Sequence, residues 1–221
     1  MNILAVIPAH NEANTIAAVA GGVKAMGYDV LVVDDGSADA TADLARQEGA
    51  LVLATGQKSG KGNALRLGFD YAVKNGYEAV IALDGDGQHD PADIKLFLES
   101  YRLTGASVIN GNRMAEPRGM PFVRFATNTV MSWIISLICR RRIPDTQCGF
   151  RFMTTGVLSN IQLECADFEI ETELLVKASR KGFKIASVPI ATIYRNEVSK
   201  IKPVRDTLRF VRFIIRVLRQ K

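Results

Sequence analysis

Cysteine and histidine are scarce in this chain, with three Cys and two His among 221 residues. The cysteines, at positions 139, 148 and 165, are odd in number and follow no metal-ligand spacing, which excludes a disulfide framework and a zinc site. Reduced thiols of this kind are typical of the cytosol. No Gly-x-Ser-x-Gly turn accompanies His10 and His89, so a hydrolase triad is not expected.

Long apolar runs are also missing. The longest, residues 130–139, falls far short of the ~20 residues that a helix needs to span a bilayer. The N-terminus lacks the basic and apolar regions of a secretory signal. With 48% hydrophobic and 23% charged residues and no low-complexity tract, the composition is that of one globular domain with a buried core.

Acidic residues are rare only near the C-terminus. Residues 195–221 hold nine Lys and Arg against two acids, a net charge of +7 within a total of +5. The rest of the chain is therefore close to neutral, at −2. Such a tail is typical of a segment that meets an anionic partner, either a membrane surface, a nucleic acid or acidic substrate groups.

Short apolar runs alternate with helix-like segments in the first half of the chain. Five runs rich in Val, Ile and Leu predict buried strands at 3–7, 30–33, 51–53, 79–83 and 107–109. Helices are predicted at 12–26, 39–48, 61–75 and 91–102, the last beginning at Pro91 after Asp90. This alternation predicts an α/β fold: a mostly parallel central sheet with helices on both faces.

The second half is less regular. We expect helices at 122–142, 170–181 and 204–219, and strands at 148–153 and 184–189. These elements would finish the sheet and carry the acceptor side of a site.

Acidic residues follow three of the first four predicted strands. They are Glu12 after the first strand, Asp34 and Asp35 after the second, and Asp84 and Asp86 after the fourth. Ligands in open α/β sheets bind at the carboxyl ends of the strands. Five acids at that edge would repel one another, so a divalent cation or a hydrogen-bonded ligand is the natural compensation. The pair Asp84 and Asp86 can hold Mg²⁺ or Mn²⁺ and leave positions open for phosphates.

Other nucleotide-binding patterns are absent or incomplete. Gly60-Lys61-Gly62 lacks the spacing and the Ser or Thr of a P-loop, although Lys61 could still contact a phosphate. No Gly-x-Gly-x-x-Gly follows the first strand, which argues against a dinucleotide-binding oxidoreductase.

Several motifs, taken in order, resemble those of the family 2 glycosyltransferases, and within them the dolichyl- or polyprenyl-phosphate sugar synthases. They lie at residues 8–12 (PAHNE), 33–41 (VDDGSADAT), 60–64 (GKGNA), 84–89 (DGDGQH), 111–113 (GNR), 145–151 (DTQCGFR) and 168–171 (FEIE), with further matches around 194–195 and 199–200. The resemblance covers about residues 1–202. It implies the GT-A fold, a nucleotide-diphosphate sugar donor and Mg²⁺ or Mn²⁺.

The resemblance also assigns roles by position. Nucleoside and donor contacts fall on Pro8, Ala9, His10, Glu12, Val32, Asp34, Asp35, Lys61, Asp84 and Gly85. The metal and the donor diphosphate fall on Asp84, Asp86 and Gln88, and cationic positions near the phosphates fall on Arg113, Arg195 and Lys200.

The chemistry leaves two acceptors open. An inverting transfer of a hexose, from a donor of the GDP-mannose or UDP-glucose type, could end on a polyprenyl or dolichyl phosphate. That oxygen is already ionised, since its second pKa is about 6, so cationic residues need only position it. A hydroxyl of a polysaccharide or glycolipid would instead need a carboxylate base, for which Asp145 and Glu171 are the candidates. Glu171 could equally be a solvated first-turn residue of its helix. A nucleotide-sugar-binding protein without turnover is a third possibility.

Two segments suggest contact with a membrane. Apolar residues recur at helical spacing within 122–138 and three arginines follow at 140–142, which fits either a core helix or an interfacial one. In the tail, residues 203–221 are predicted to form a second unit beside the 1–202 domain. The spacing predicts an amphipathic helix with a basic face (Arg205, Arg209, Arg212, Arg216, Arg219) and an apolar face (Leu208, Val211, Ile215, Leu218).

We therefore expect a peripheral protein on the cytoplasmic face of the inner membrane, with anionic lipid and a possible separate membrane protein as partners. No nucleic-acid recognition motif is present, so nucleic acid is not expected as a partner.

Overall fold

The computed structural model describes residues 1–117, 119–193 and 203–219, and in the last helix the side chains of 209–217. These residues form a seven-stranded sheet in the order β3-β2-β1-β4-β6-β5-β7. Its strands are β1 (Ile3–Ala9), β2 (Asp29–Asp34), β3 (Leu51–Ala54), β4 (Ala79–Ala82), β5 (Val108–Asn112), β6 (Arg151–Thr154) and β7 (Ile185–Pro189). Strand β6 runs antiparallel to β4 and β5, and the other pairs are parallel.

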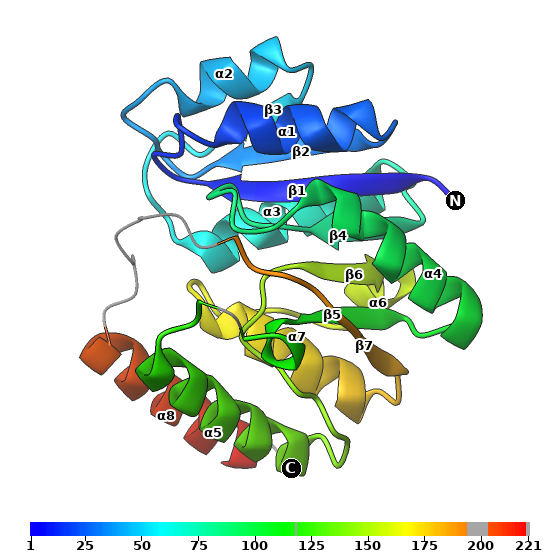
Figure 1. The fold of residues 1–221 in the computed structure, drawn as a ribbon, viewed down its shortest axis with the longest axis vertical. Helices are drawn as coiled ribbons and strands as arrows, with labels where there is room; N and C mark the ends of the chain where they lie inside the picture. The colour runs from blue at the N-terminus through cyan, green and yellow to red at the C-terminus, as the bar shows by residue number, and fades with distance from the viewer. Residues whose placement is uncertain (118, 194–202, 220–221) are drawn as a thin grey trace.

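Helices cover both faces of the sheet (Figure 1). On one face lie α1 (Ile16–Ala25), α2 (Thr41–Gln47) and α4 (Ile94–Thr104), the last preceded by a short 3-10 turn η1 (Pro91–Asp93). On the other lie α3 (Lys61–Lys74), α6 (Thr155–Asn160) and α7 (Glu169–Arg180), with α5 (Phe122–Ile138) and α8 (Pro203–Arg219) packed outside α7; a second 3-10 turn, η2, is Arg113–Ala115.

Strand β1 lies in the middle of the sheet and is buried along its whole length. Ile3, Ala5 and Ile7 face the layer of α1 and α4, whereas Leu4 and Val6 face the layer of α3 and α7. Successive side chains of a strand point to opposite faces, so a strand covered on both sides is apolar throughout. The α/β architecture expected from the short apolar runs is confirmed.

Several boundaries differ from the prediction. The helix predicted to begin at 12 begins at Ile16, because the backbone turns at Asn11, whose φ is 54°, and the Glu12 carbonyl accepts the first helical N–H groups. The helix predicted to reach 142 ends at Ile138, and Arg140 follows with φ 49°, outside the helical region. The strand predicted from 148 begins at Arg151, and the short helix α6 was not predicted.

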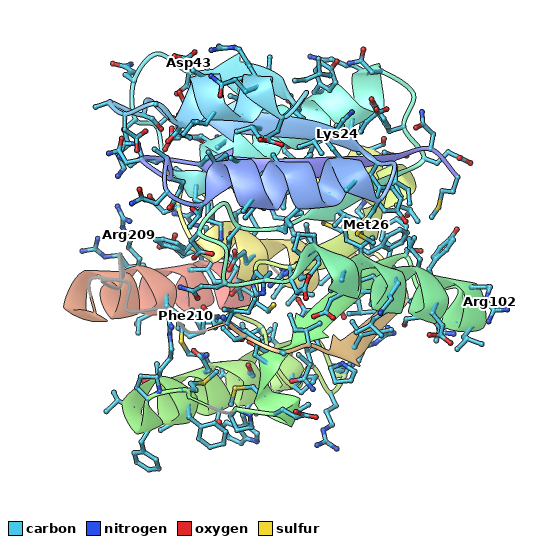
Figure 2. All side chains as sticks on the ribbon, turned by 45° about the horizontal axis from the view of Figure 1, so that its top comes forward. Lys24, Met26, Asp43, Arg102, Arg209 and Phe210 are labelled. Carbon is cyan, nitrogen blue, oxygen red and sulfur yellow. The ribbon has the colours of Figure 1, made fainter. Side chains whose placement is uncertain are left out.

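The C-terminal helix α8 is partly built into the core. Phe210, Phe213 and Val217 are buried against the layer formed by α5 and α7. Arg180 of α7 donates a 2.6 Å hydrogen bond to the Val217 carbonyl. Figure 2 shows Arg209 and Phe210 projecting from different sides of α8. The helix therefore has a buried apolar face that the sequence interpretation did not include.

The predicted faces of α8 are found only in part. Val211 and Ile215, from the predicted apolar face, are exposed, as are Arg212 and Arg216 from the basic face. Arg209 pairs with Asp167 at 2.6 Å. The side chains of Arg205, Leu208, Leu218 and Arg219 lie outside those described.

Candidate active site

The candidate site lies at the edge of the sheet where β1, β2 and β4 end. These three strands are parallel neighbours, so the segments that follow them meet at one edge. Strand β6 runs the other way, so its beginning, rather than its end, lies at this edge. Residues 145–150, which belong to the loop before β6, therefore lie at the same edge (Figure 1).

Side chains tie the segments after β1, β2 and β4 together. Asn11 accepts a hydrogen bond from the Ala38 N–H at 2.8 Å, and its own N–H donates to Ser37 Oγ at 2.9 Å. Thr15 Oγ1 donates to the Gly85 carbonyl at 2.7 Å. These hydrogen bonds hold the three segments against one another at this edge.

Two acids assigned to the donor by resemblance hold backbone in this structure. Asp34 accepts from the N–H and the hydroxyl of Ser37, which closes the turn after β2. Asp35 accepts from the Ser59 N–H at 2.6 Å, from Ser59 Oγ at 2.7 Å and from the Gly60 N–H at 2.9 Å. Asp35 thus fixes the loop immediately before α3, and through it the first residue of that helix, Lys61.

Lys61 lies between two carboxylates. Its Nζ is 2.5 Å from Asp84 Oδ1 and 2.6 Å from Glu171 Oε1, and the Phe168 ring centroid is 5.6 Å away. The Lys61 side chain is 17% exposed. Burial lowers the pKa of Lys61, but the charges of Asp84 and Glu171 outweigh burial and raise it above its ordinary value. Lys61 is therefore cationic at neutral pH and joins the segment after β4 to α7.

Asp84 and Asp86 supply carboxylate oxygens, the ligands that Mg²⁺ and Mn²⁺ prefer. Burial and the nearby charge of Asp84 raise the pKa of Asp86 to about 6, so its negative charge lacks full compensation. Gly149 leaves the space for Asp84, because a Cβ at that position would lie 2.6 Å from Asp84 Oδ2. Within the described residues no group of three or more His, Cys, Asp and Glu could hold a metal ion, so two carboxylates would supply part of its shell.

The rest of the segment after β4 is ordered by backbone contacts. The Gln88 N–H donates to Asp86 Oδ1 at 3.0 Å, and the Gln88 carbonyl accepts from the Ile193 N–H at 2.9 Å. His89 is buried beside Phe150, with ring centroids 5.3 Å apart, and burial lowers the pKa of His89 to about 4. His89 is therefore neutral at pH 7.

Arg113 and Asp145 form a buried two-point ion pair. Arg113 Nε lies 2.7 Å from Asp145 Oδ2, and Arg113 Nη2 lies 3.0 Å from Oδ1. The backbone N–H groups of Arg113 and Gln147 donate to the same carboxylate at 3.1 Å. Burial raises the pKa of Asp145, but hydrogen bonds and charge from Arg113 lower it below its usual range overall. Both candidate carboxylates in the second half, Asp145 and Glu171, therefore have a cationic partner.

A further residue, Arg151, was not singled out from the sequence. It is buried at the start of β6 and donates to three backbone carbonyls: Cys148 at 2.7 Å, Thr146 at 2.9 Å, and Glu171. Arg151 thus joins the 145–149 loop to the beginning of α7. A charged residue opening a buried apolar strand was the available signal.

The first turn of α7 is not the solvated one that was the alternative for Glu171. Glu171 and Glu173 are both buried. Glu173 accepts from the N–H groups of Glu164 and Cys165 and pairs with Lys177 at 2.8 Å. Glu173 therefore anchors the loop before α7, whereas Glu171 faces Lys61.

The remaining assigned residues fall into three groups. Pro8, Ala9 and Val32 are buried in strands β1 and β2, and Val32 packs in the core on the α1 side. His10 and Glu12 are half-buried at the edge where these strands end. Arg195 and Lys200 lie outside the described residues.

Comparisons with known proteins agree with this architecture. Among solved structures, mannosyl-3-phosphoglycerate synthase from Rubrobacter xylanophilus matches with a TM-score of 0.78 at 20% identity, over 100% of this chain and 73% of that chain. Glucosyl-3-phosphoglycerate synthase from Mycobacterium tuberculosis, crystallised with Mn²⁺ and UDP-glucose, matches with a TM-score of 0.74 at 23% identity, over 98% and 77%. The fold is that of the GT-A glycosyltransferases.

The family follows from the sequence comparison. The family model described as "Glycosyl transferase family 2" matches residues 4–160, and the chain belongs to this family. An undecaprenyl-phosphate mannosyltransferase from Micrococcus luteus is 30% identical over 88% of this chain and 85% of its own length. A polyprenol monophosphomannose synthase from Mycolicibacterium smegmatis is 28% identical over 85% and 76%. The family resemblance drawn from the motifs is thereby confirmed.

Proposed function

We propose that this glycosyltransferase moves a hexose, with inversion, from a nucleotide-diphosphate sugar to a polyprenyl or dolichyl phosphate. The pairing of both second-half carboxylates with cations carries this proposal. Asp145 is engaged by Arg113 and Glu171 by Lys61, so neither is arranged as a base for a hydroxyl. A phosphate monoester is largely ionised at neutral pH and needs no such base. The names of the relatives from Micrococcus luteus and Mycolicibacterium smegmatis agree with a lipid-phosphate acceptor.

On the donor side, Asp84, Asp86 and Gln88 would hold Mg²⁺ or Mn²⁺ together with the diphosphate. The bound cation supplies stabilisation of the negative charge that grows on the leaving diphosphate. His10, Glu12 and Asp34 lie at the same edge of the sheet, where β1 and β2 end, and would face the nucleoside. Pro8, Ala9 and Gly85 would contribute backbone at the same edge, with Val32 supporting it from the core.

On the acceptor side, Arg113 would hold the lipid phosphate, with Asp145 as a positioning residue that fixes its guanidinium. An oxygen of that phosphate attacks the anomeric carbon from the side opposite the leaving group, and the bond from that carbon to the diphosphate oxygen breaks. The electron pair leaves with the nucleoside diphosphate. Arg195 and Lys200 are assigned to the same phosphates by resemblance.

We propose that the α5–α8 end of the molecule rests on an anionic membrane surface. Five large apolar side chains of α5 are exposed, among them Trp133 at 64% and Phe122 at 81%, and Val211 and Ile215 are exposed on α8. Arg140, Arg141 and Arg142 follow α5, and Arg212 and Arg216 are exposed on α8. Amphipathic helices with basic and aromatic residues bind at the headgroup level. Figure 1 shows both helices at the same end of the molecule.

This surface location would place the enzyme on the cytoplasmic leaflet, where a separate membrane protein could receive its lipid product. Among the described residues, no helix has the length and apolar character required to cross a bilayer.

The acceptor proposal is tested with two lipids that differ by one group. Nucleotide-sugar consumption would be measured with a polyprenyl phosphate and with the matching polyprenol, across a panel of GDP and UDP sugars with Mn²⁺. We expect turnover with the polyprenyl phosphate but not with the polyprenol. Asp86→Asn should abolish this turnover, whereas Asp70→Asn, which changes an exposed residue of α3, should retain it. Turnover with the polyprenol would favour the hydroxyl alternative, and binding without turnover would favour the non-catalytic one.

A further inference from the structure

Lys61 neutralises Asp84, one of the two carboxylates proposed to bind the metal. Its Nζ donates to Asp84 Oδ1 at 2.5 Å, and Asp84 is the first of the two carboxylates, Asp84 and Asp86, that would bind the cation. On its other side, the Asp84 carboxylate packs against Gly149, where even a Cβ would lie within 2.6 Å of Oδ2. An incoming cation therefore meets an Asp84 that is enclosed by backbone on one side and by an ammonium group on the other.

The backbone that carries Lys61 is fixed from both directions. Asp35 holds the N–H groups of Ser59 and Gly60, and the Gly62 N–H donates to the Ala166 carbonyl at 2.7 Å. A Cβ on Gly62 would come within 2.4 Å of the Cys165 carbonyl oxygen, so only glycine allows this approach. The ammonium group stands on a four-carbon stem with rotatable bonds, so it can change partner while the start of α3 stays in place.

A diphosphate gives the ammonium group a second set of partners. Asp84, Glu171 and Lys61 meet at the edge of the sheet where the donor is proposed to bind. Phosphate oxygens are strong acceptors for lysine. In contrast, a divalent cation that arrives alone repels the ammonium group and offers it no new partner.

We propose that Lys61 is a placeholder cation that couples metal binding to donor binding. Without donor it bridges Asp84 and Glu171 and weakens the binding of a divalent cation. When the nucleotide diphosphate arrives, Lys61 exchanges its contact with Asp84 for one with the phosphates, keeps its contact with Glu171, and frees Asp84 for the metal. This inference rests on the proposed function, because it takes Asp84 and Asp86 as the donor-metal site.

The test measures Mn²⁺ binding by electron paramagnetic resonance, first without nucleotide, in the full-length protein and in Lys61→Met. We expect Mn²⁺ alone to bind at least about tenfold more tightly to Lys61→Met, since one removed like charge at close range is worth more than that at a partly buried site. Affinity for UDP or GDP in the presence of Mn²⁺ should fall in the same variant. A merely structural role for Lys61 would weaken both.

Three further variants control the result. Lys61→Arg keeps the charge and should bind Mn²⁺ alone as weakly as the parent. Lys58→Met, which removes an exposed lysine three residues earlier, should change neither affinity. Lys61→Met with Glu171→Gln removes one positive and one negative charge together, which avoids leaving Glu171 buried without its partner. Because the net charge of this double variant equals that of the parent, tighter Mn²⁺ binding must come from releasing Asp84.

Unchanged or weaker binding of Mn²⁺ alone in Lys61→Met and in the double variant would overturn the inference. Asp86→Asn separates this failure from that of the proposed function. If Asp86→Asn abolishes Mn²⁺ binding but the Lys61 variants leave it unchanged, the proposed role of Lys61 is refuted and the donor-metal site is not. Mn²⁺ binding that survives Asp86→Asn would refute the donor site itself.

Discussion

Replacing Asp145 by Asn should destabilise the protein far more than the loss of one surface ion pair. The Asp145 side chain is fully buried and the Arg113 side chain is 10% exposed, so the variant leaves a buried guanidinium without its counter-charge. Breaking a buried pair from one side costs about 3–5 kcal/mol. For a chain of this size about 1 kcal/mol corresponds to roughly 2–4 °C, so we expect the melting temperature to fall by about 6 °C or more.

The assay is urea unfolding and thermal melting of Asp145→Asn, Arg113→Met and the double variant, with Asp70→Asn as an exposed control. Two partners of one interaction are not additive, so the double variant should lose clearly less than the sum of the two single losses. Mn²⁺-dependent nucleotide affinity should be unchanged in Asp145→Asn, because Asp145 is assigned to the acceptor side. A loss below about 1 kcal/mol, the value of an exposed pair, would refute the buried-pair reasoning. Additive losses would refute it as well.

Three other predictions concern the rest of the molecule. The double variant Trp133→Ser with Arg212→Gln should pellet less with anionic vesicles than the parent protein, whereas Leu103→Ser, which changes an exposed residue of α4, should pellet as the parent does. Equal pelleting of the parent and both variants would place membrane contact elsewhere. Phe213→Ala should cost about 3–5 kcal/mol in urea unfolding, because Phe213 is buried in the core, and a loss below about 1 kcal/mol would show that α8 is not part of it. Burial raises the pKa of Cys139 to about 11 and of Cys148 to about 12, so iodoacetamide at pH 9 should modify them only in urea. Because both folded pKa values are raised, the stability from these thiols is complete below about pH 8.5 and is lost as the pH rises toward 11; a urea midpoint that increases over that interval would contradict it.

The sheet and the edge at which β1, β2 and β4 end could be predicted because their signals are local. Runs of Val, Ile and Leu define β1, β2 and β4, and the acids that follow them meet at one edge through parallel pairing alone. The direction of β6 could not be predicted, since a short buried strand is equally apolar in either orientation. That direction is what brings residues 145–150 to the site.

The state of the carboxylates could not be predicted for a different reason. Glu171 and Lys61 are 110 positions apart, and their 2.6 Å contact depends on α3 and α7 lying on the same face of the sheet. From the sequence, Asp145 and Glu171 stayed open as bases, because the sequence does not show which cation each carboxylate faces. The buried face of α8 was missed because Phe210, Phe213 and Val217 also fit an amphipathic pattern; the division of the chain at 202 stays a prediction.

In the proposed reaction an oxygen atom of the lipid phosphate receives the sugar. Phosphorus NMR of a reaction with polyprenyl phosphate, a nucleotide sugar and Mn²⁺ directly observes the phosphorus atom to which this oxygen is bonded. We expect the signal of the lipid phosphomonoester to disappear and a phosphodiester signal to replace it as nucleoside diphosphate is released. Neither change should occur with Asp86→Asn. A phosphomonoester signal that persists while the nucleotide sugar is consumed would contradict a lipid-phosphate acceptor, since the sugar would then have gone to water or to a hydroxyl.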